Sequence, residues 1–180
     1  MSKIIELIKK IPKAELHCHI EGTLESDLLF KLAKRNDIRI PFANVNEVKS
    51  AYNFSNLESF LNIFYQGSKV LITEQDFFDL AWAYALKCQE DNVVHTEIFF
   101  DPQTHVNRGI NFDVVINGIY KALLKAEKEL GISSKIIMCI LRHLDEDSAF
   151  KTLDQALIHK NKIIGVGLDS SEVGHPPSKF

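Results

Sequence analysis

Short apolar runs alternate with longer amphipathic segments along the whole chain, and this alternation constrains the fold more than any other feature. The apolar runs have strand length and occupy residues 14–20, 93–100, 136–141 and 162–169. Between them, helical periodicity covers 26–36, two segments that begin after Asn56 and Thr73, one that begins at Asn111, and 146–159. Strands that are apolar on both faces and joined by helices form parallel sheets through right-handed crossovers. The sequence therefore predicts an α/β fold, either an open doubly wound sheet or a (β/α) barrel.

Local capping signals predict where several helices begin and end. Thr73, with Asp76 three residues later, predicts a helix start, and Asn111 predicts another. Gly131 predicts the end of the helix that Asn111 begins, because glycine readily adopts the left-handed conformation found there. Residues 38–55 contain a proline and several asparagines and are interpreted as a long surface loop.

Composition is that of an ordinary globular protein of one domain. The 180 residues include 46% hydrophobic and 25% charged residues, and the net charge is −3. Because there is no basic surplus, we expect no nucleic-acid partner and no membrane partner, and a small molecule is the expected ligand. The three cysteines are odd in number and far apart, which favours a reduced, cytoplasmic protein over a disulfide framework. A dinucleotide-binding glycine fingerprint and a P-loop are both missing.

A His-x-His pair ends the first predicted strand, in the segment ELHCHIEG. Alternate residues of a strand share a face, so His17 and His19 are expected to point the same way and Cys18 the other way. In parallel α/β folds, active sites form at the carboxyl ends of the strands. Two imidazoles there can converge on one zinc ion, at Zn–N distances of about 2.0–2.1 Å. The alternative is a pair of hydrogen-bonded core histidines, which the acidic-Gly turn that follows disfavours. Cys18 is interpreted as a small buried apolar residue.

Polar residues follow the other three predicted strands as well. At the end of the second strand, the candidates are Phe99 and Phe100, followed by Asp101, Gln103 and His105. At the end of the third, they are Arg142 and His143. At the end of the fourth, they are Asp169, Ser170, Ser171 and Glu172. Phe99 or Phe100 could wall a planar ring. Taken singly, each residue fits loop capping or core packing. Four polar strand ends at one edge nevertheless predict the rim of an active site.

From these residues alone, the sequence predicts a divalent-metal site on a β/α scaffold, with hydrolytic chemistry. The segments ELHCHIEGTLE, EIFFDPQTH, ILRH and GVGLDSSEVGHPPSKF, in this order, resemble the adenosine/adenine deaminase family of zinc amidohydrolases. The resemblance runs through the whole chain, and FFDPQTH and LDSSEVGHPP are similar to its adenine deaminase branch. Glu21 stands where adenosine deaminases usually have an aspartate beside the ribose, and its longer side chain is expected to occupy the ribose space.

The resemblance implies a (β/α)₈ TIM barrel, of which residues 1–180 hold roughly the first four β/α units, as the N-terminal half of a single metal-dependent deaminase domain. It implies one Zn²⁺ ion with His17 and His19 as ligands, together with a histidine after the fifth strand and an aspartate after the eighth. The ion would lower the pKa of its water, and the resulting hydroxide would add to purine C6. The implied substrate-binding candidates are Glu21, Gly22, Phe100, Asp101, Asp169, Ser170, Ser171 and Glu172.

Several functions remain open at this stage. The first expectation is conversion of adenine and water to hypoxanthine and ammonia. The 180-residue chain alone is expected to be inactive, because the later ligands and the family's proton-transferring glutamate follow the fourth strand. The alternatives are an adenosine deaminase, a non-catalytic half-barrel that binds metal or a partner, and a phosphoesterase of the polymerase-and-histidinol-phosphatase type, which FFDPQTH and LDSSE disfavour. The half-barrel is expected to self-associate through its exposed sheet edges. The other histidines match no ligand motif, and His159 is expected on a solvated helix face.

Overall fold

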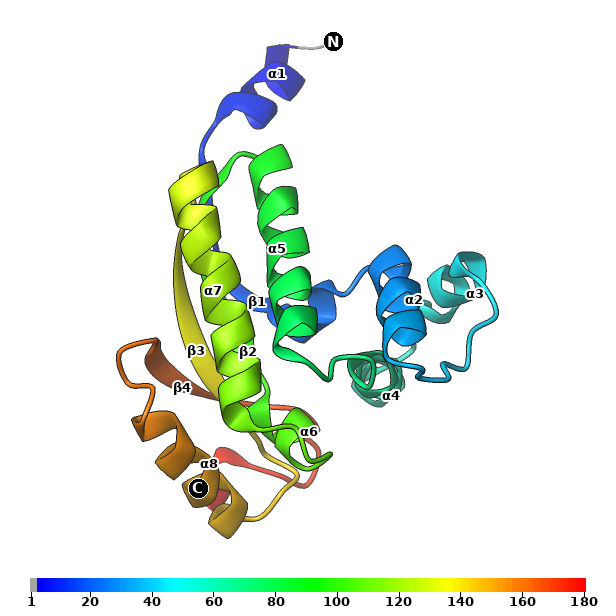
Figure 1. Ribbon diagram of the computed structural model, residues 1–180, viewed down its shortest axis with the longest axis vertical. Coiled ribbons are helices and arrows are strands. Elements are labelled where there is room, and N and C mark those ends of the chain that lie inside the picture. Colours follow the sequence, from blue (N-terminus) through cyan, green and yellow to red (C-terminus); the bar gives the residue numbers. More distant parts are fainter. Residues whose placement is uncertain (1–2) are drawn as a thin grey trace.

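The computed structural model describes residues 3–180 and shows a four-stranded sheet against which helices pack (Figure 1). The strands are β1 (Lys13–His19), β2 (Val93–Phe100), β3 (Ser133–Leu141) and β4 (Ile163–Asp169). The helices are α1 (Lys3–Lys10), α2 (Ser26–Arg35), α3 (Val45–Ala51), α4 (Leu57–Ser68), α5 (Glu74–Glu90), α6 (Pro102–Val106), α7 (Phe112–Leu130) and α8 (Glu146–Leu157), with short 3-10 helices η1 (Ile20–Thr23) and η2 (Pro177–Lys179). No helix within residues 3–180 combines the length and the apolarity that a membrane crossing requires.

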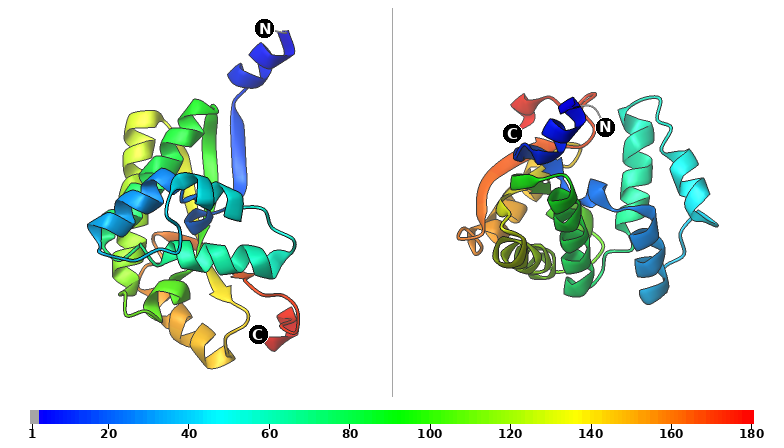
Figure 2. Two further views of the ribbon diagram at one scale, coloured as in Figure 1. Left: turned by 90° about the vertical axis from the view of Figure 1, so that its right-hand side faces the viewer. Right: turned by 90° about the horizontal axis from the view of Figure 1, so that it is seen from above.

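The four strands are parallel and lie in sequence order, β1-β2-β3-β4, with β1 and β4 on the outside. In a doubly wound sheet the chain returns to the other side of the first strand, giving orders such as 3-2-1-4 or 2-1-3-4, whereas a barrel adds each β/α unit beside the previous one. The order therefore favours the TIM-barrel-like fold over the open sheet. Because the strands run the same way, their carboxyl ends meet at one edge, which we call the catalytic edge. Helix α1 extends beyond the opposite, amino end of β1 (Figure 2).

Helices α5 and α7 lie side by side over the sheet, and a core of large apolar side chains fills the space beneath them (Figure 1). Their close approach depends on Gly118 of α7. A Cβ atom there would lie 2.4 Å from the carbonyl oxygen of Glu74 and 2.7 Å from Cβ of Phe77, so any larger residue would force the helices apart. The fully buried side chains of this core include Phe77, Leu80, Ile98, Phe100, Ile116, Ile119 and Met138.

The predicted caps of α5 and α7 are confirmed. Thr73 and Asp76 form a reciprocal capping box, in which each side chain accepts a hydrogen bond from the backbone N–H of the other. Asn111 accepts a hydrogen bond from the backbone N–H of Asp113, at the first turn of α7. Gly131 ends the helix with φ at 70°, in the left-handed region.

The predicted loop over residues 38–55 is wrong in its second half, where α3 forms. Asn44 caps this helix by accepting a hydrogen bond from the backbone N–H of Glu47, and Val48 anchors it in the core at 1% exposure. Two turns with one buried residue give no visible apolar periodicity, which is why the pattern indicated a loop. The short helix α6, which starts at Pro102 directly after β2, was missed for the same reason.

The expectation that His159 lies on a solvated helix face is also wrong. Helix α8 ends at Leu157, and His159 lies in the following turn with 8% exposure. Its Nε2 atom lies 2.6 Å from Oδ1 of Asp113, and its ring stacks on Phe112. The turn therefore folds this histidine against the start of α7.

Asp76 joins the end of α2 to the start of α5 through a buried group of hydrogen bonds. Its Oδ2 atom accepts from the backbone N–H groups of Ile72 (3.2 Å) and Thr73 (2.8 Å) and from the Asn36 amide (2.8 Å). Its Oδ1 atom pairs with the Arg35 guanidinium at 2.8 Å, and the Asp76 side chain is 0% exposed. Burial by itself raises the pKa of Asp76, but the hydrogen bonds from Thr73, Asn36 and Arg35 together lower that pKa below its usual value.

We expect Asp76→Asn to lower the free energy of unfolding by about 2–3 kcal/mol at pH 7, because hydrogen bonds to a charged group contribute about 1.5–3 kcal/mol. The lowered folded-state pKa means that this stabilisation is present above the unfolded-state pKa of about 3.9 and is lost as pH falls through the folded-state value. Urea unfolding at several pH values should therefore show the difference from wild type shrinking below about pH 4. The control is Asp79→Asn, which removes the partly exposed carboxylate that also pairs with Arg35. Equal losses in the two variants would contradict the role of Asp76.

Candidate metal centre

His17 and His19 lie side by side at the carboxyl end of β1, with ring centroids 5.4 Å apart. Their Nε2 atoms face each other at 3.3 Å. Both rings stack on Phe99 of β2, at centroid distances of 4.5 Å and 5.2 Å. The β1–β2 pairing is irregular between Glu15 and Cys18, the stretch that carries His17. Irregularities of this kind re-aim side chains next to active sites.

The spacing of the two imidazoles fits a zinc ion. Two nitrogens bonded to zinc at about 2.0–2.1 Å in tetrahedral geometry lie about 3.3–3.4 Å apart. The observed Nε2–Nε2 separation of His17 and His19 is 3.3 Å. The other ring nitrogen of His19, Nδ1, lies 3.2 Å from Oδ2 of Asp169, the arrangement that ligating histidines usually have. The pair can therefore supply two of the protein ligands of a zinc site.

A second group of donor atoms surrounds the Nδ1 side of His19. One atom from each of His19, Asp101, Cys139 and Asp169 lies within 4.8 Å of the others. Burial and then the charge of Glu21 raise the pKa of Asp101 well above its usual value, and burial raises the pKa of the Cys139 thiol. Metal ligands must lose their protons, so a thiol that keeps its proton is a poor ligand. This group is better suited to holding a proton than to holding an ion.

The electrostatic field at His19 favours positive charge. The carboxylates of Asp101 and Asp169 raise the pKa of the His19 imidazole to about 10, against the opposing effect of burial. The Oδ1 atoms of both aspartates are buried and have no hydrogen-bond partner among the described residues. Two partly unsatisfied carboxylates beside one imidazole therefore attract a cation, whether a proton or a metal ion.

Glu21 does not line the cavity beside the histidines, contrary to its prediction as a substrate contact. Its side chain is 0% exposed, and its Oε1 atom accepts hydrogen bonds from the backbone N–H of Asp101 and from Nε2 of His105, both at 3.0 Å. The guanidinium of Arg108 donates to Nδ1 of His105 at 2.9 Å, so Nε2 of His105 carries the hydrogen. Glu21 therefore connects the segment after β1 to the DPQTH segment after β2, and a direct role in filling ribose space is not supported by its position.

Phe100 likewise does not line this cavity. It is 0% exposed and packs on Phe112 in the core, whereas Phe99 stacks under the two histidines. Successive strand residues point to opposite faces of the sheet. Only one of the two phenylalanines can therefore share a face with His17 and His19. The sequence left the choice open because both are apolar.

The candidates after β4 divide into two groups. Asp169 and Ser170 line the cavity beside the histidines. Ser171 instead hydrogen-bonds to Glu58 at the start of α4. Glu172 has a side chain that is 73% exposed, with its Oε1 atom 3.7 Å from Arg142, and it does not line this cavity.

A cavity of about 290 Å³ opens beside the two histidines, between the catalytic edge and α4. Its lining residues are His17, His19, Gly22, Leu57, Phe60, Leu61, Phe64, Tyr65, Asp101, Leu168, Asp169 and Ser170. Helices α2, α3 and α4 stand together to one side of the sheet (Figure 2), and α4 is held across the edge by a 2.7 Å hydrogen bond between Tyr65 and Ser170. The roof of the cavity is thus aromatic and apolar, and its floor carries the histidine pair.

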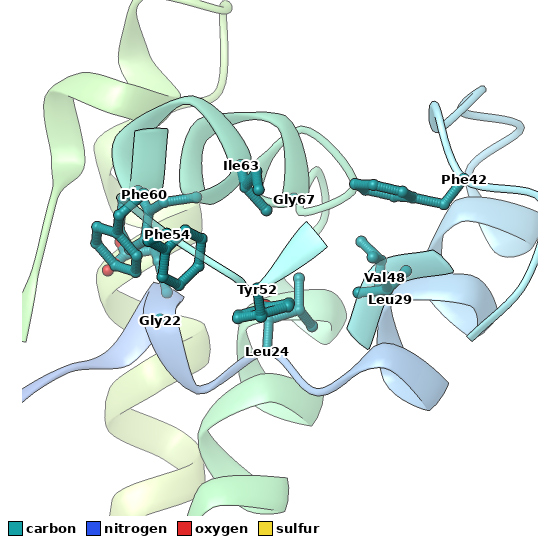
Figure 3. A pocket seen from close by; sticks show the side chains of 12 residues that line it. Gly22, Leu24, Leu29, Phe42, Val48, Tyr52, Phe54, Phe60, Ile63 and Gly67 are labelled. Carbon is teal, nitrogen blue, oxygen red and sulfur yellow. The ribbon is translucent and has the colours of Figure 1, made fainter. Parts of the chain in front are cut away.

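An apolar cavity of about 20 Å³ lies behind this roof, between α2, α3 and α4. The side chains of Phe54, Phe60 and Tyr52 are arranged around it (Figure 3). It shares Gly22, Phe60 and Phe64 with the cavity beside the histidines. Because its volume is about that of one water molecule, it is too small for a purine ring.

Sequence reasoning missed the roof residues, notably Phe60, Phe64 and Tyr65. Phe60 and Phe64 are four residues apart, which is the spacing of an ordinary core-facing helix stripe. The sequence gives no signal that this stripe faces a cavity, because α4 reaches the catalytic edge through a contact with Ser170, 105 residues away.

Comparisons with known proteins agree with this geometry. The family model described as adenosine deaminase matches residues 12–180. The adenine deaminase of Acinetobacter baylyi is 65% identical over 97% of this chain and 53% of its own length. The adenine deaminase of Wolinella succinogenes is 63% identical over 100% of this chain and 54% of its own length. The chain thus spans about half the length of the curated relatives it matches.

Solved structures share the fold. The crystal structure of adenine deaminase from Arthrobacter aurescens superposes with a TM-score of 0.90 at 47% identity, covering 93% of this chain and 51% of that one. An amidohydrolase from Burkholderia ambifaria, solved with bound Zn, gives a TM-score of 0.85 at 26% identity and covers 97% and 48%. The strand order, the paired histidines and the match over residues 12–180 lead to one conclusion: the chain belongs to the adenosine deaminase family.

Proposed function

We propose that this chain forms the first four β/α units of an adenine deaminase, which converts adenine and water to hypoxanthine and ammonia. The observation that carries the proposal is the pair of Nε2 atoms on His17 and His19, set 3.3 Å apart at the edge where barrel enzymes build their active sites. Support for the substrate comes from the names of the relatives, which are adenine deaminases at 57–65% identity.

We propose zinc as the cofactor. Zinc, when bound, activates water at neutral pH for attack on the carbon that carries the amino group. His17 and His19 are proposed as two of its ligands, and a bound Zn in the Burkholderia ambifaria amidohydrolase supports this choice. The resemblance to the family implies that the remaining ligands follow the fifth and eighth strands. We infer that residues supplied after β4 complete the site.

The cavity supplies the features that a flat heteroaromatic base requires. Phe60 and Phe64 of α4 present aromatic surface, and Leu61 and Leu168 present apolar surface that excludes water. Polar groups are confined to the histidine pair, Asp101, Asp169, Tyr65 and Ser170. Burial raises the pKa of Tyr65, so its hydroxyl keeps its proton and is able to donate a hydrogen bond at neutral pH.

We expect His17→Ala and His19→Ala each to lower zinc from about one ion per chain to a small fraction, because each change removes a ligand. The measurement is elemental analysis of the protein as the cell makes it, after removal of loosely bound metal. His95→Ala is the matched control, since His95 is also a strand histidine but lies near the amino end of β2. Zinc content that stays at the wild-type level in both ligand variants would exclude this site.

Adenine is expected to be turned over more efficiently than adenosine, measured as kcat/KM, because the relatives at 57–65% identity are named adenine deaminases. The measurement is ammonia release from the two substrates under the same conditions, by a full-length protein in which the proposed later strands complete the site. A preference for adenosine would assign the protein to the adenosine deaminases, and release from neither substrate would favour a non-catalytic binding role.

The 180-residue chain by itself is expected to release no ammonia from adenine above a His17→Ala control. Two histidines leave zinc short of the three protein ligands that catalytic sites ordinarily have. The outer strands β1 and β4 also leave Leu16, Ile164 and Val166 exposed, and unpaired strand edges favour association. Sedimentation velocity should therefore show concentration-dependent association of the isolated chain. A monomeric chain with turnover above the control would contradict both expectations.

A further inference from the structure

His19 has a partner on each of its ring nitrogens. Its Nε2 atom lies 3.3 Å from Nε2 of His17. Its Nδ1 atom lies 3.2 Å from Oδ2 of Asp169 and 3.9 Å from Oδ1 of Asp101. One nitrogen therefore faces the proposed metal position, and the other faces a carboxylate at the end of β4.

We propose that Asp169 is a positioning residue for the metal centre, acting through His19. The inference rests on the proposed zinc site. A neutral imidazole carries a hydrogen on one nitrogen and a lone pair on the other. Oδ2 of Asp169, 3.2 Å from Nδ1, is placed to accept the hydrogen of that nitrogen, which would keep the lone pair on Nε2 and hold the ring in the orientation that faces His17.

Strand β4 is shaped to allow this contact, because Gly167 leaves space for the Phe99 ring. A Cβ atom at position 167 would lie 2.9 Å from Sγ of Cys139 and 3.3 Å from a ring carbon of Phe99. The first distance is shorter than side chains tolerate, and the second would require the Phe99 ring to move. Both histidine rings stack on Phe99. Gly167, two residues before Asp169, therefore leaves room for the Phe99 ring that supports His19.

Ser170 fixes the backbone directly after Asp169. Its φ is 74°, in the left-handed region that residues other than glycine rarely adopt. The Ser170 hydroxyl is hydrogen-bonded to Tyr65 of α4 at 2.7 Å and to Nδ1 of His143 at 2.8 Å. Uncommon backbone conformations of this kind persist only where surrounding contacts hold them, and they cluster at functional sites. Here two side-chain bonds hold the turn that sets the position of Asp169.

Asp169 fits this role better than a direct contact with substrate. Its side chain is 14% exposed, and its Oδ1 atom is buried without a hydrogen-bond partner among residues 3–180. Its Oδ2 atom is occupied by His19. The carboxylate of Asp101 lies farther from Nδ1 of His19, at 3.9 Å. The backbone N–H of Asp101 donates a hydrogen bond to Glu21, which fixes the position of this residue. We therefore assign Asp101 a supporting role.

The test is the Zn²⁺ affinity of the protein as the cell makes it, measured by competition with a chromophoric chelator. Asp169→Ala is expected to weaken Zn²⁺ binding by about 10–100-fold, the usual effect of removing a partner of a ligating histidine. Asp169→Asn keeps a neutral acceptor and is expected to lie between Asp169→Ala and wild type. Glu172→Ala, in the same loop but with a 73% exposed side chain, is the control and should bind as wild type does.

A second measurement separates positioning from general damage to the fold. Ring ¹⁵N shifts of His19 in the zinc-loaded wild type should show a protonated Nδ1, and Asp169→Asn should retain this signature. Near-UV circular dichroism of the metal-free variants should match wild type.

Equal Zn²⁺ affinity of Asp169→Ala and wild type would overturn the role of Asp169 alone. If Asp169→Ala does not fold, Asp169→Asn decides: a loss of about threefold or more supports the inference, and undiminished affinity overturns it. Zinc binding by wild type that does not depend on His17 would instead refute the proposed metal centre, and this inference with it.

Discussion

The parallel pairing of β1 with β2 is the interaction on which the rest of the site depends. It places His19 opposite Phe99 and Cys18 opposite Ile98. A shift of this register by one residue would move His17 and His19 to the opposite face of the sheet. Cys18 would then occupy the face that they now share, because strand residues alternate between faces. The imidazole pair, its aromatic support and the carboxylates of the neighbouring strands all follow from this one register.

Local signals explain most of the fold that could be predicted from sequence. Thr73, Asn111 and Gly131 act within one turn of where they stand, so their effects can be read from a few neighbouring residues. The short helices α3 and α6 escaped prediction, since two turns or fewer show no apolar period. His159 was misjudged because its partner, Asp113, lies 46 residues away. What failed in each case was a contact between distant segments or an element too short to leave a pattern.

In the candidate site, too, local patterns could be predicted from sequence and contacts between distant segments could not. The two-residue spacing of His17 and His19 is sufficient to predict that they share a face, because the strand period is 2. Sequence placed Glu21, Phe100 and Glu172 at the cavity too, since polar or aromatic residues at strand ends all look alike without coordinates. The structure separates them by burial and direction: Glu21 binds His105, Phe100 packs on Phe112, and Glu172 is exposed.

The hydrogen bond between Tyr65 and Ser170 joins residues 105 positions apart, and the contact between Glu58 and Ser171 joins residues 113 apart. Helix α4 is therefore secured over the catalytic edge by groups that the ribosome adds much later. While a nascent chain has been made only as far as α7, β4 does not yet exist, and the roof of the cavity lacks both of these contacts. The cavity is consequently among the last parts of the described chain to become ordered during synthesis, because Ser170 and Ser171 follow every residue of the apolar core.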